Sequence, residues 1–316
     1  MVVSSKIGTV LVKGGLLLFL CCLLCFPATA LTGAKEGLLL WFQQVMPSLL
    51  PFLILSSLFL STGLSDRIAK RLSPFLSPVF RCSASGCYAV VIGLLSGLPI
   101  GAKTVADLTV SGRITKKEGE YLLPLCNNPS PLFLLGFISV SVLQKPELRY
   151  PLLVIVILSS VVASMLLRPT EKPERGSNKG TAKQASVPFH FSFVLLDAAI
   201  EQAFLVLTKI GGYLILFSVL AKLLALLPLP SLLLACIGAL LEITTGSNAL
   251  SGLSLAEPVR ISLVTGFVAF GGLSAAAQTK SVLTGTSFPL THYLFTKGVA
   301  GLFAGLLMWI FLSVTM

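Results

Sequence analysis

Charged residues are scarce in this chain of 316 residues: Asp, Glu, Lys and Arg together make up 11% of it. A soluble domain carries about 25%. Hydrophobic residues reach 55%, and the mean hydropathy is +0.94. This composition excludes an ordinary soluble domain and indicates an integral membrane protein.

The sequence also lacks the motifs of several chemistries. It contains no G-x-S-x-G, no H-E-x-x-H and no Walker loop, so no enzyme is predicted, and an intramembrane enzyme that uses Glu242 is the alternative. The histidines are His190 and His292 alone, so neither a metal site nor a cofactor is expected. The seven cysteines follow no extracytoplasmic disulfide pattern.

Seven apolar runs approach the roughly 20 residues that a helix needs to cross a bilayer. Because lipid offers no partner for backbone amides, and because these runs are long and rich in Leu, we predict helices rather than barrel strands. The runs cover Ile7–Phe26, Leu38–Leu60, Tyr121–Leu143, Tyr150–Leu167, Thr208–Leu227, Val259–Ala277 and Tyr293–Val314. The predicted fold class is an all-α polytopic membrane protein with about seven transmembrane helices.

Two shorter apolar segments are rich in Gly and run directly into polar residues. Gly86–Gly101 reads GCYAVVIGLLSGLPIG, and Cys236–Gly246 reads CIGALLEITTG. Broken segments at matching positions of two halves point to a midplane binding site in secondary transporters. We therefore predict two re-entrant hairpins. Their predicted hinge residues are Gly97, Pro99, Gly101 and Gly246.

The net charge of +11 comes from bases in short loops, which predicts topology determinants rather than a nucleic-acid partner. If Cys87–Val110 crossed the membrane, the basic residues before and after it would lie on opposite faces, against the positive-inside rule. If it instead enters and leaves on the cytoplasmic face, both groups lie inside. The bases then left outside are Lys35, Lys145, Arg149, Lys222 and Arg260.

One long polar stretch divides the chain into halves that share a weak internal repeat. Three spanning helices and one hairpin in each half make the halves inverted relative to each other. Residues 1–33 are predicted as an N-terminal transmembrane helix, with a cleavable signal peptide as the alternative. The other predicted domains are a first repeat at 34–168, a cytoplasmic linker at 169–188 and a second repeat at 189–316.

Polar residues at membrane depth are the candidates for function. The adjacent amides of Asn127 and Asn128 offer donors and acceptors to a polar solute, and Gln278 could also bind one. Glu242 is the carboxylate of the second hairpin, and its burial would suggest a coupling ion, a proton or a basic partner such as Lys103. In the alternative readings, Glu242 lies in water at a hairpin mouth and Lys103 is a snorkelling anchor.

Several segments together resemble a known family. GLLLWFQQVMPSLLPFLI, SGLPIGAK, SGRITKKEGEYLLPLCNNPSPLF, LEITTG and FGGLSAAAQ resemble the sporulation integral membrane protein YlbJ family, over roughly Ala34 to Phe311. That family is grouped with the nucleoside-recognition or Gate domains of spore maturation proteins, nucleoside transporters and ferrous-iron transporters. The resemblance implies a multi-pass protein of the cytoplasmic (inner) membrane that is needed for spore formation.

The same resemblance implies a site and a function. In the nucleoside transporters, polar side chains of two hairpins and two unwound helices hold the solute. By analogy, the positions expected to bind solute are Asn127, Asn128, Ser130, Thr244, Thr245 and Asn248, with Glu242 for coupling. The leading prediction is transport of a small polar solute or ion in a lipid bilayer, with a homo-oligomer as a candidate assembly. The alternative is a non-transporting scaffold or assembly protein of the developing spore.

Overall fold

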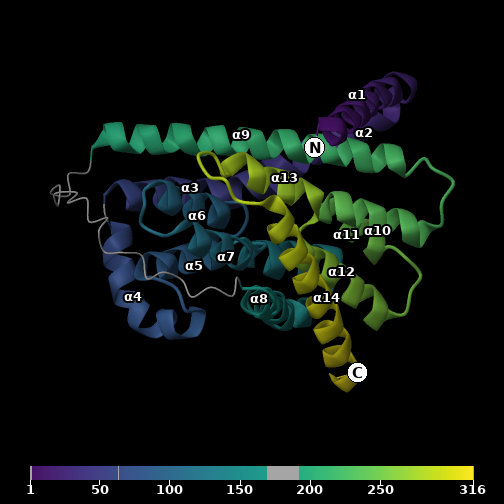
Figure 1. The fold of residues 1–316 in the computed structure, drawn as a ribbon. Coiled ribbons are helices and arrows are strands. Elements are labelled where there is room, and N and C mark those ends of the chain that lie inside the picture. Colours follow the sequence, from purple (N-terminus) through teal and green to yellow (C-terminus); the bar gives the residue numbers. More distant parts are fainter. Residues whose placement is uncertain (1, 63, 169–191, 316) are drawn as a thin grey trace.

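The computed structural model describes residues 2–62, 64–168 and 192–315, which form helices joined by short loops with no strand among them (Figure 1). The predicted all-α class is therefore confirmed. The predicted linker at 169–188 lies outside the described residues. The bounds before it are α1 Val2–Cys25, α2 Pro27–Leu40, η1 Trp41–Val45, α3 Met46–Ser61, α4 Leu64–Phe80, α5 Ala84–Ser96, α6 Ile100–Val110, α7 Lys116–Cys126, η2 Phe133–Val142, η3 Pro146–Leu148 and α8 Arg149–Leu166.

The second half begins with a helix of 32 residues that runs along one edge of the molecule (Figure 1). Shorter helices follow, and a long helix closes the chain. The bounds are α9 Phe193–Leu224, α10 Ser231–Leu241, α11 Ile243–Ser251, α12 Glu257–Phe270, α13 Gly272–Val282 and α14 Leu290–Thr315. The segments η1 and η2 are π-helical, and η3 is a single 3₁₀ turn.

Four helical segments are long and apolar enough to cross a membrane, and up to six spans result if each of two bent pairs counts as one. The four are Pro146–Leu166, Phe193–Leu224, Glu257–Val282 and Leu290–Thr315. The bent pairs are Lys13–Cys25 with Pro27–Gln43, at 104°, and Arg67–Phe80 with Ala84–Ser96, at 86°. These findings support a multi-pass membrane protein, while the count of seven stays a prediction.

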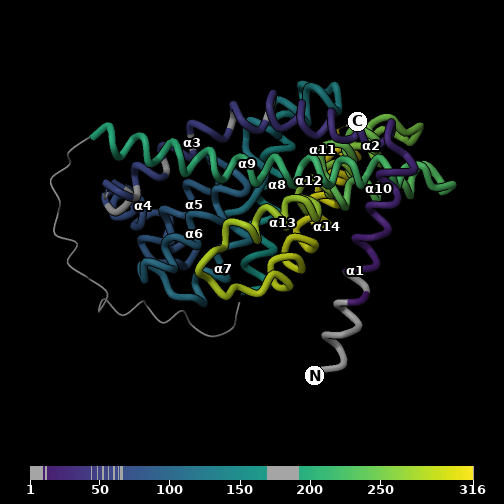
Figure 2. The backbone as a smooth tube through the Cα atoms, turned by 90° about the horizontal axis from the view of Figure 1, so that it is seen from above, coloured from purple at the N-terminus to yellow at the C-terminus, as the bar shows by residue number. Residues whose placement is uncertain are grey.

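Glycines bring α2 directly against α9. A Cβ on Gly33 would lie 2.8 Å from the Cα of Val219, and one on Gly37 would lie 2.8 Å from the Cα of Ile215. The predicted domain boundary at residue 33 therefore falls inside a helix that is packed on the body. By contrast, α1 projects from the body (Figure 2), and Phe19, Cys22 and Leu23 in its later turns pack against α2 and α9.

The starts of α5 and α7 lie together at one end of the molecule. Ser83 caps α5, and its backbone N donates to Oε1 of the buried Glu118, on α7, at 2.6 Å. Arg168, after α8, joins this end by donating from Nη2 to the carbonyl of Arg81 at 2.8 Å. The starts of α5 and α7 lie side by side. The chain between them therefore doubles back, and α5 and α6 form a helical hairpin.

A second group of charges lies at the opposite end of α8. Lys145 Nζ is 2.8 Å from Oε1 of Glu257, the first residue of α12. The hydrogen bond and charge of Glu257 raise the pKa of Lys145 above its ordinary value, and desolvation and the charge of nearby Arg260 oppose this shift. Lys145 and Arg260 are thus neighbours in the fold. From the sequence, both are predicted to lie on the same face of the membrane.

Candidate functional site

Four breaks between consecutive helical segments lie close to one another in the fold. The interruptions fall at Gly97–Pro99 between α5 and α6, at Asn127–Ser130 between α7 and η2, at Glu242 between α10 and α11, and at Gly271 between α12 and α13. Each interruption frees backbone donors and acceptors, which persist at membrane depth only where protein or a water-lined cavity satisfies them.

The first hairpin grips the broken end of α7. Gly93 of α5 and Gly101 of α6 both lie against the backbone carbonyl of Cys126, and a Cβ on either would collide with it. At the hairpin tip, the Leu98 N donates to the Asn128 carbonyl at 2.6 Å. Gly97 has a φ of +79°, which an L side chain rarely adopts, so glycine is required there.

We expect Gly101→Ala to destabilise the protein strongly. The added methyl would meet the Cys126 carbonyl, which is backbone and cannot rotate away, and overpacking of this kind costs about 1–3 kcal/mol or more. Thermal unfolding of the purified protein measures the loss. Gly298→Ala on α14 is the matched control, because a Cβ there meets nothing within 4 Å. Equal melting temperatures for the two variants would contradict the tight packing.

The second hairpin has a comparable close contact. Gly246 of α11 lies directly against the backbone of Ala239 on α10, with no space for a Cβ. A Cβ on Gly272 would lie 3.2 Å from Cγ2 of Ile243, so the start of α13 rests on this hairpin. The tip of the first hairpin meets the break between α12 and α13, where a Cβ on Gly271 would be 4.0 Å from Cδ2 of Leu98. In both hairpins, the predicted hinges Gly101 and Gly246 are sites of close packing.

A cavity of about 380 Å³ occupies the region where the four interruptions meet. Residues from every interruption line it: Leu98, Pro129, Ser130, Glu242, Ile243, Thr244 and Gly271. Further polar lining comes from Gln43, Ser141, Ser274 and Gln278, and the rest of the wall is largely Leu, Val, Pro and Phe. Glu242 is the one charged residue in the lining of this cavity, within the described part of the chain.

Glu242 is a buried carboxylate held by a helix terminus. Its side chain is the N-cap of α11: Oε1 accepts from the Thr244 N at 3.0 Å and from the Thr244 hydroxyl, and Oε2 accepts from the Thr245 N at 2.7 Å. A carboxylate at a helix N-terminus is favoured by the helix dipole. Because the residue is only 1% exposed, the alternative of a carboxylate in open water at a hairpin mouth is wrong.

A second buried polar network lies beside the cavity. Nδ2 of Asn127 donates to the hydroxyls of Thr279 at 2.7 Å and Tyr293 at 2.8 Å. Lys297, which is completely buried on α14, donates from Nζ to Oδ1 of Asn128 at 2.8 Å and to the more distant Oγ of Ser160 at 3.4 Å. Among the described residues, both acceptors of Lys297 Nζ are neutral groups.

The structure separates the predicted solute-binding residues into three groups. Ser130, Thr244 and Gln278 line the cavity. Asn127 and Asn128 are buried behind its wall, in the network with Lys297, and do not line the cavity. Thr245 contributes its backbone N to Glu242, and Asn248 is exposed one turn further along α11, so neither side chain lines the cavity.

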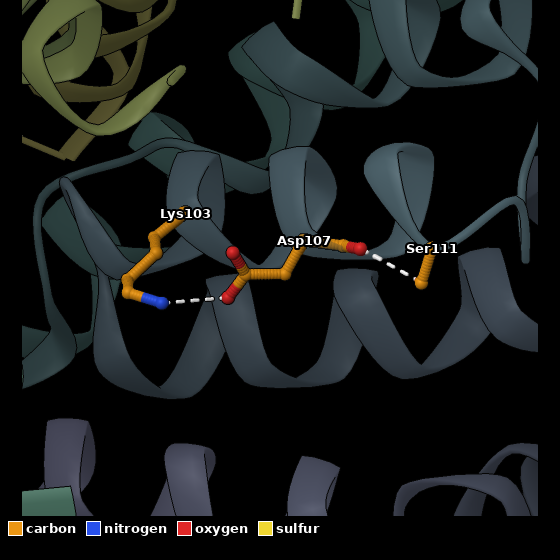
Figure 3. Close-up of polar contacts among 3 residues, drawn as sticks. All are labelled: Lys103, Asp107 and Ser111. Atoms are coloured by element: carbon orange, nitrogen blue, oxygen red, sulfur yellow. Dashed lines mark hydrogen bonds and ion pairs between the residues drawn. The ribbon is translucent and has the colours of Figure 1, made fainter. Parts of the chain in front are cut away.

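The suggested pairing of Lys103 with Glu242 is not observed. Figure 3 shows Lys103 directed along its own helix, where Nζ lies 2.6 Å from Oδ2 of Asp107, and Ser111 donates to the Asp107 carbonyl. Residues four apart on a helix are neighbours, so this partner is closer than one on the other hairpin. Both side chains are partly exposed, at 28% and 38%, and such a pair contributes little to stability.

Four residues of the buried network were not among the sequence-based candidates: Ser160, Thr279, Tyr293 and Lys297. Lys297 is the most informative of them, because it is an ionisable residue within the apolar run Tyr293–Val314. An ionisable side chain inside a membrane span is by default a candidate for function. The sequence therefore contained a usable signal at Lys297, although it did not indicate the partner.

The helical fold, the apolar spans and the core cavity define an all-α integral membrane protein. No family model and no solved structure matches the chain. The chain is similar to the sporulation integral membrane protein YlbJ of Bacillus subtilis (strain 168), with 26% identity over 96% of this chain and 84% of the relative. This similarity over nearly the whole length supports the YlbJ family for the chain and confirms the resemblance of its motifs.

Proposed function

We propose that the protein moves a small polar solute or ion across the membrane by alternating access, in support of spore formation. The observation that carries this proposal is the cavity. Residues at four helix interruptions line it, and one of them is the buried carboxylate Glu242. Discontinuous helices around a midplane site are typical of secondary transporters. A volume of about 380 Å³ is within the range of small-molecule sites.

Two inverted repeats with re-entrant hairpins are part of the proposal. The order of elements supports them: α5–α6 and α10–α11 are broken hairpins, α7–η2 and α12–α13 are interrupted helices, and α8 and α14 close the halves. The contact of Ser83 with Glu118 further supports entry and exit of the first hairpin on one face. That face is the cytoplasmic one under the positive-inside rule, since bases precede and follow the hairpin.

Cysteine labelling tests this topology. Single cysteines placed at Lys70 and at Lys116 should both react with a membrane-impermeant maleimide from the cytoplasmic side alone, because a re-entrant hairpin returns the chain to the face from which it came. A cysteine at Arg149, at the far end of α8, is the control and should react from the opposite side. Labelling of positions 70 and 116 from different sides would contradict the re-entrant topology.

Ligand-induced thermal stabilisation tests the function. Purified protein would be screened against nucleosides, dipicolinate, amino acids and metal ions. Stabilisation by one class that is lost in Gln278→Ala, a cavity substitution, would support transport. No response to any compound would favour the second candidate, a membrane scaffold or assembly protein, whose support is the similarity to the sporulation integral membrane protein of Bacillus subtilis.

A further inference from the structure

The exposed face of α4 combines positive charge with large apolar side chains. Arg67, Lys70 and Arg71 lie on it in the first half of the helix, and Phe75 and Val79 follow, at 75% and 56% exposure. On a helical projection these five residues fall within one contiguous face, because they repeat at spacings of three and four. We call these five residues the α4 face.

The body of the protein fixes which way this face points. Ala69 and Phe80 of α4 are buried in the same core as Cys87 of α5 and Leu122 of α7. These contacts hold the opposite side of α4 against the protein. The α4 face is thus the side of the helix that is left uncovered by the described residues.

The orientation of α4 relative to the first hairpin is equally informative. The segments Arg67–Phe80 and Ala84–Ser96 meet at 86°. In Figure 1, α4 correspondingly turns away from α5 at one margin of the molecule. If α5 enters the membrane from the cytoplasm, a helix perpendicular to it lies along the membrane surface.

We propose that the α4 face binds anionic phospholipid headgroups at the cytoplasmic surface. Arg67, Lys70 and Arg71 contact the lipid phosphates, and Phe75 and Val79 enter the boundary between headgroups and acyl chains. Charge complementarity supports anionic lipid, since α4 carries these three bases and one acid, Asp66. The inference rests on the topology proposed above but not on transport, so it can hold for a protein that carries no solute.

A tryptophan placed in the face reports on the lipid around it. Phe75→Trp in the full-length protein would be reconstituted into nanodiscs with brominated phosphatidylglycerol or brominated phosphatidylcholine at equal mole fraction. Quenching of Trp41 and Trp309, the native tryptophans, is subtracted with the parent protein. We expect quenching by the anionic lipid to be at least twice that by the zwitterionic lipid, because each base near an anionic surface strengthens lipid association about fivefold.

Charge removal tests whether the α4 face itself is responsible. Lys70→Gln with Arg71→Gln should abolish the preference for phosphatidylglycerol, whereas Lys35→Gln with Arg149→Gln, which removes the same charges elsewhere, should preserve it. Equal quenching by both lipids in the Phe75→Trp protein would overturn the proposal. So would absence of quenching by either lipid, or an equal effect of the two double substitutions. None of these quenching measurements depends on solute transport, so they can succeed even if the transport proposal fails.

Discussion

We expect Asn128→Ala to lower the melting temperature of the purified protein by about 4 °C. The substitution removes the acceptor at 2.8 Å from the fully buried Nζ of Lys297, and the acceptor that remains among the described residues is Ser160, at 3.4 Å. A buried Nζ left without its main acceptor costs up to about 3 kcal/mol. A loss of this size corresponds to about 4 °C for a chain of this length.

A second substitution separates this cause from general damage to the core. Adding Lys297→Met to Asn128→Ala removes the unsatisfied Nζ and should restore more than half of the lost stability, which is a non-additive result. Asn127→Ala provides the control, because the partners of Asn127 are the neutral hydroxyls of Thr279 and Tyr293. Lys297→Met should not rescue that variant. Additive losses in both pairs would show that Asn128 does not act through Lys297.

Glu242→Gln is expected to weaken binding of whichever compound in the thermal screen stabilises the protein by about tenfold to a hundredfold. The change keeps the size of the side chain but removes the charge from the cavity, and a hydrogen bond to a charged group contributes about 1.5–3 kcal/mol. The affinity follows from the dependence of the melting temperature on ligand concentration. The matched control is Glu257→Gln, which alters a partly exposed carboxylate in an ion pair.

The same pair of variants tests the proposed role in spore formation. In a spore-forming host that lacks its own copy of the gene, transport predicts a marked loss of heat-resistant spores with Glu242→Gln and little change with Glu257→Gln. A scaffold requires the fold but not the charge in its cavity. Normal spore numbers with Glu242→Gln, at normal protein levels in the membrane, would therefore argue against transport.

Local chemistry made the interruptions predictable from the sequence. The positions of Gly97, Asn127 and Glu242 follow from Gly, Pro and polar residues within apolar runs, which cannot continue as regular membrane helices without a reason. The all-α class likewise followed from the length and composition of the runs. Among the solute-binding candidates, Ser130, Thr244 and Gln278 do line the cavity, because the residues at and near the interruptions converge there.

The remaining features depend on tertiary packing. Asn127 contacts residues 152 and 166 positions away, and no local pattern states which way its amide points. Lys297 lies in a run that is otherwise strongly apolar. A search for membrane spans therefore includes it in the helix without marking it as a candidate site residue. The partner of Lys103 was in principle readable, since Asp107 lies four residues further along the same helix.

The close packing of Gly93 and Gly101 against the Cys126 carbonyl restricts how this molecule can change shape. The backbones of α5 and α6 both contact the backbone of α7. We therefore expect these three helices to move together as a rigid body. Gly246 against Ala239 binds α10 and α11 in the same manner. We therefore expect the cavity to open at the looser contact between Leu98 and Gly271, and a crosslink there should block the proposed transport.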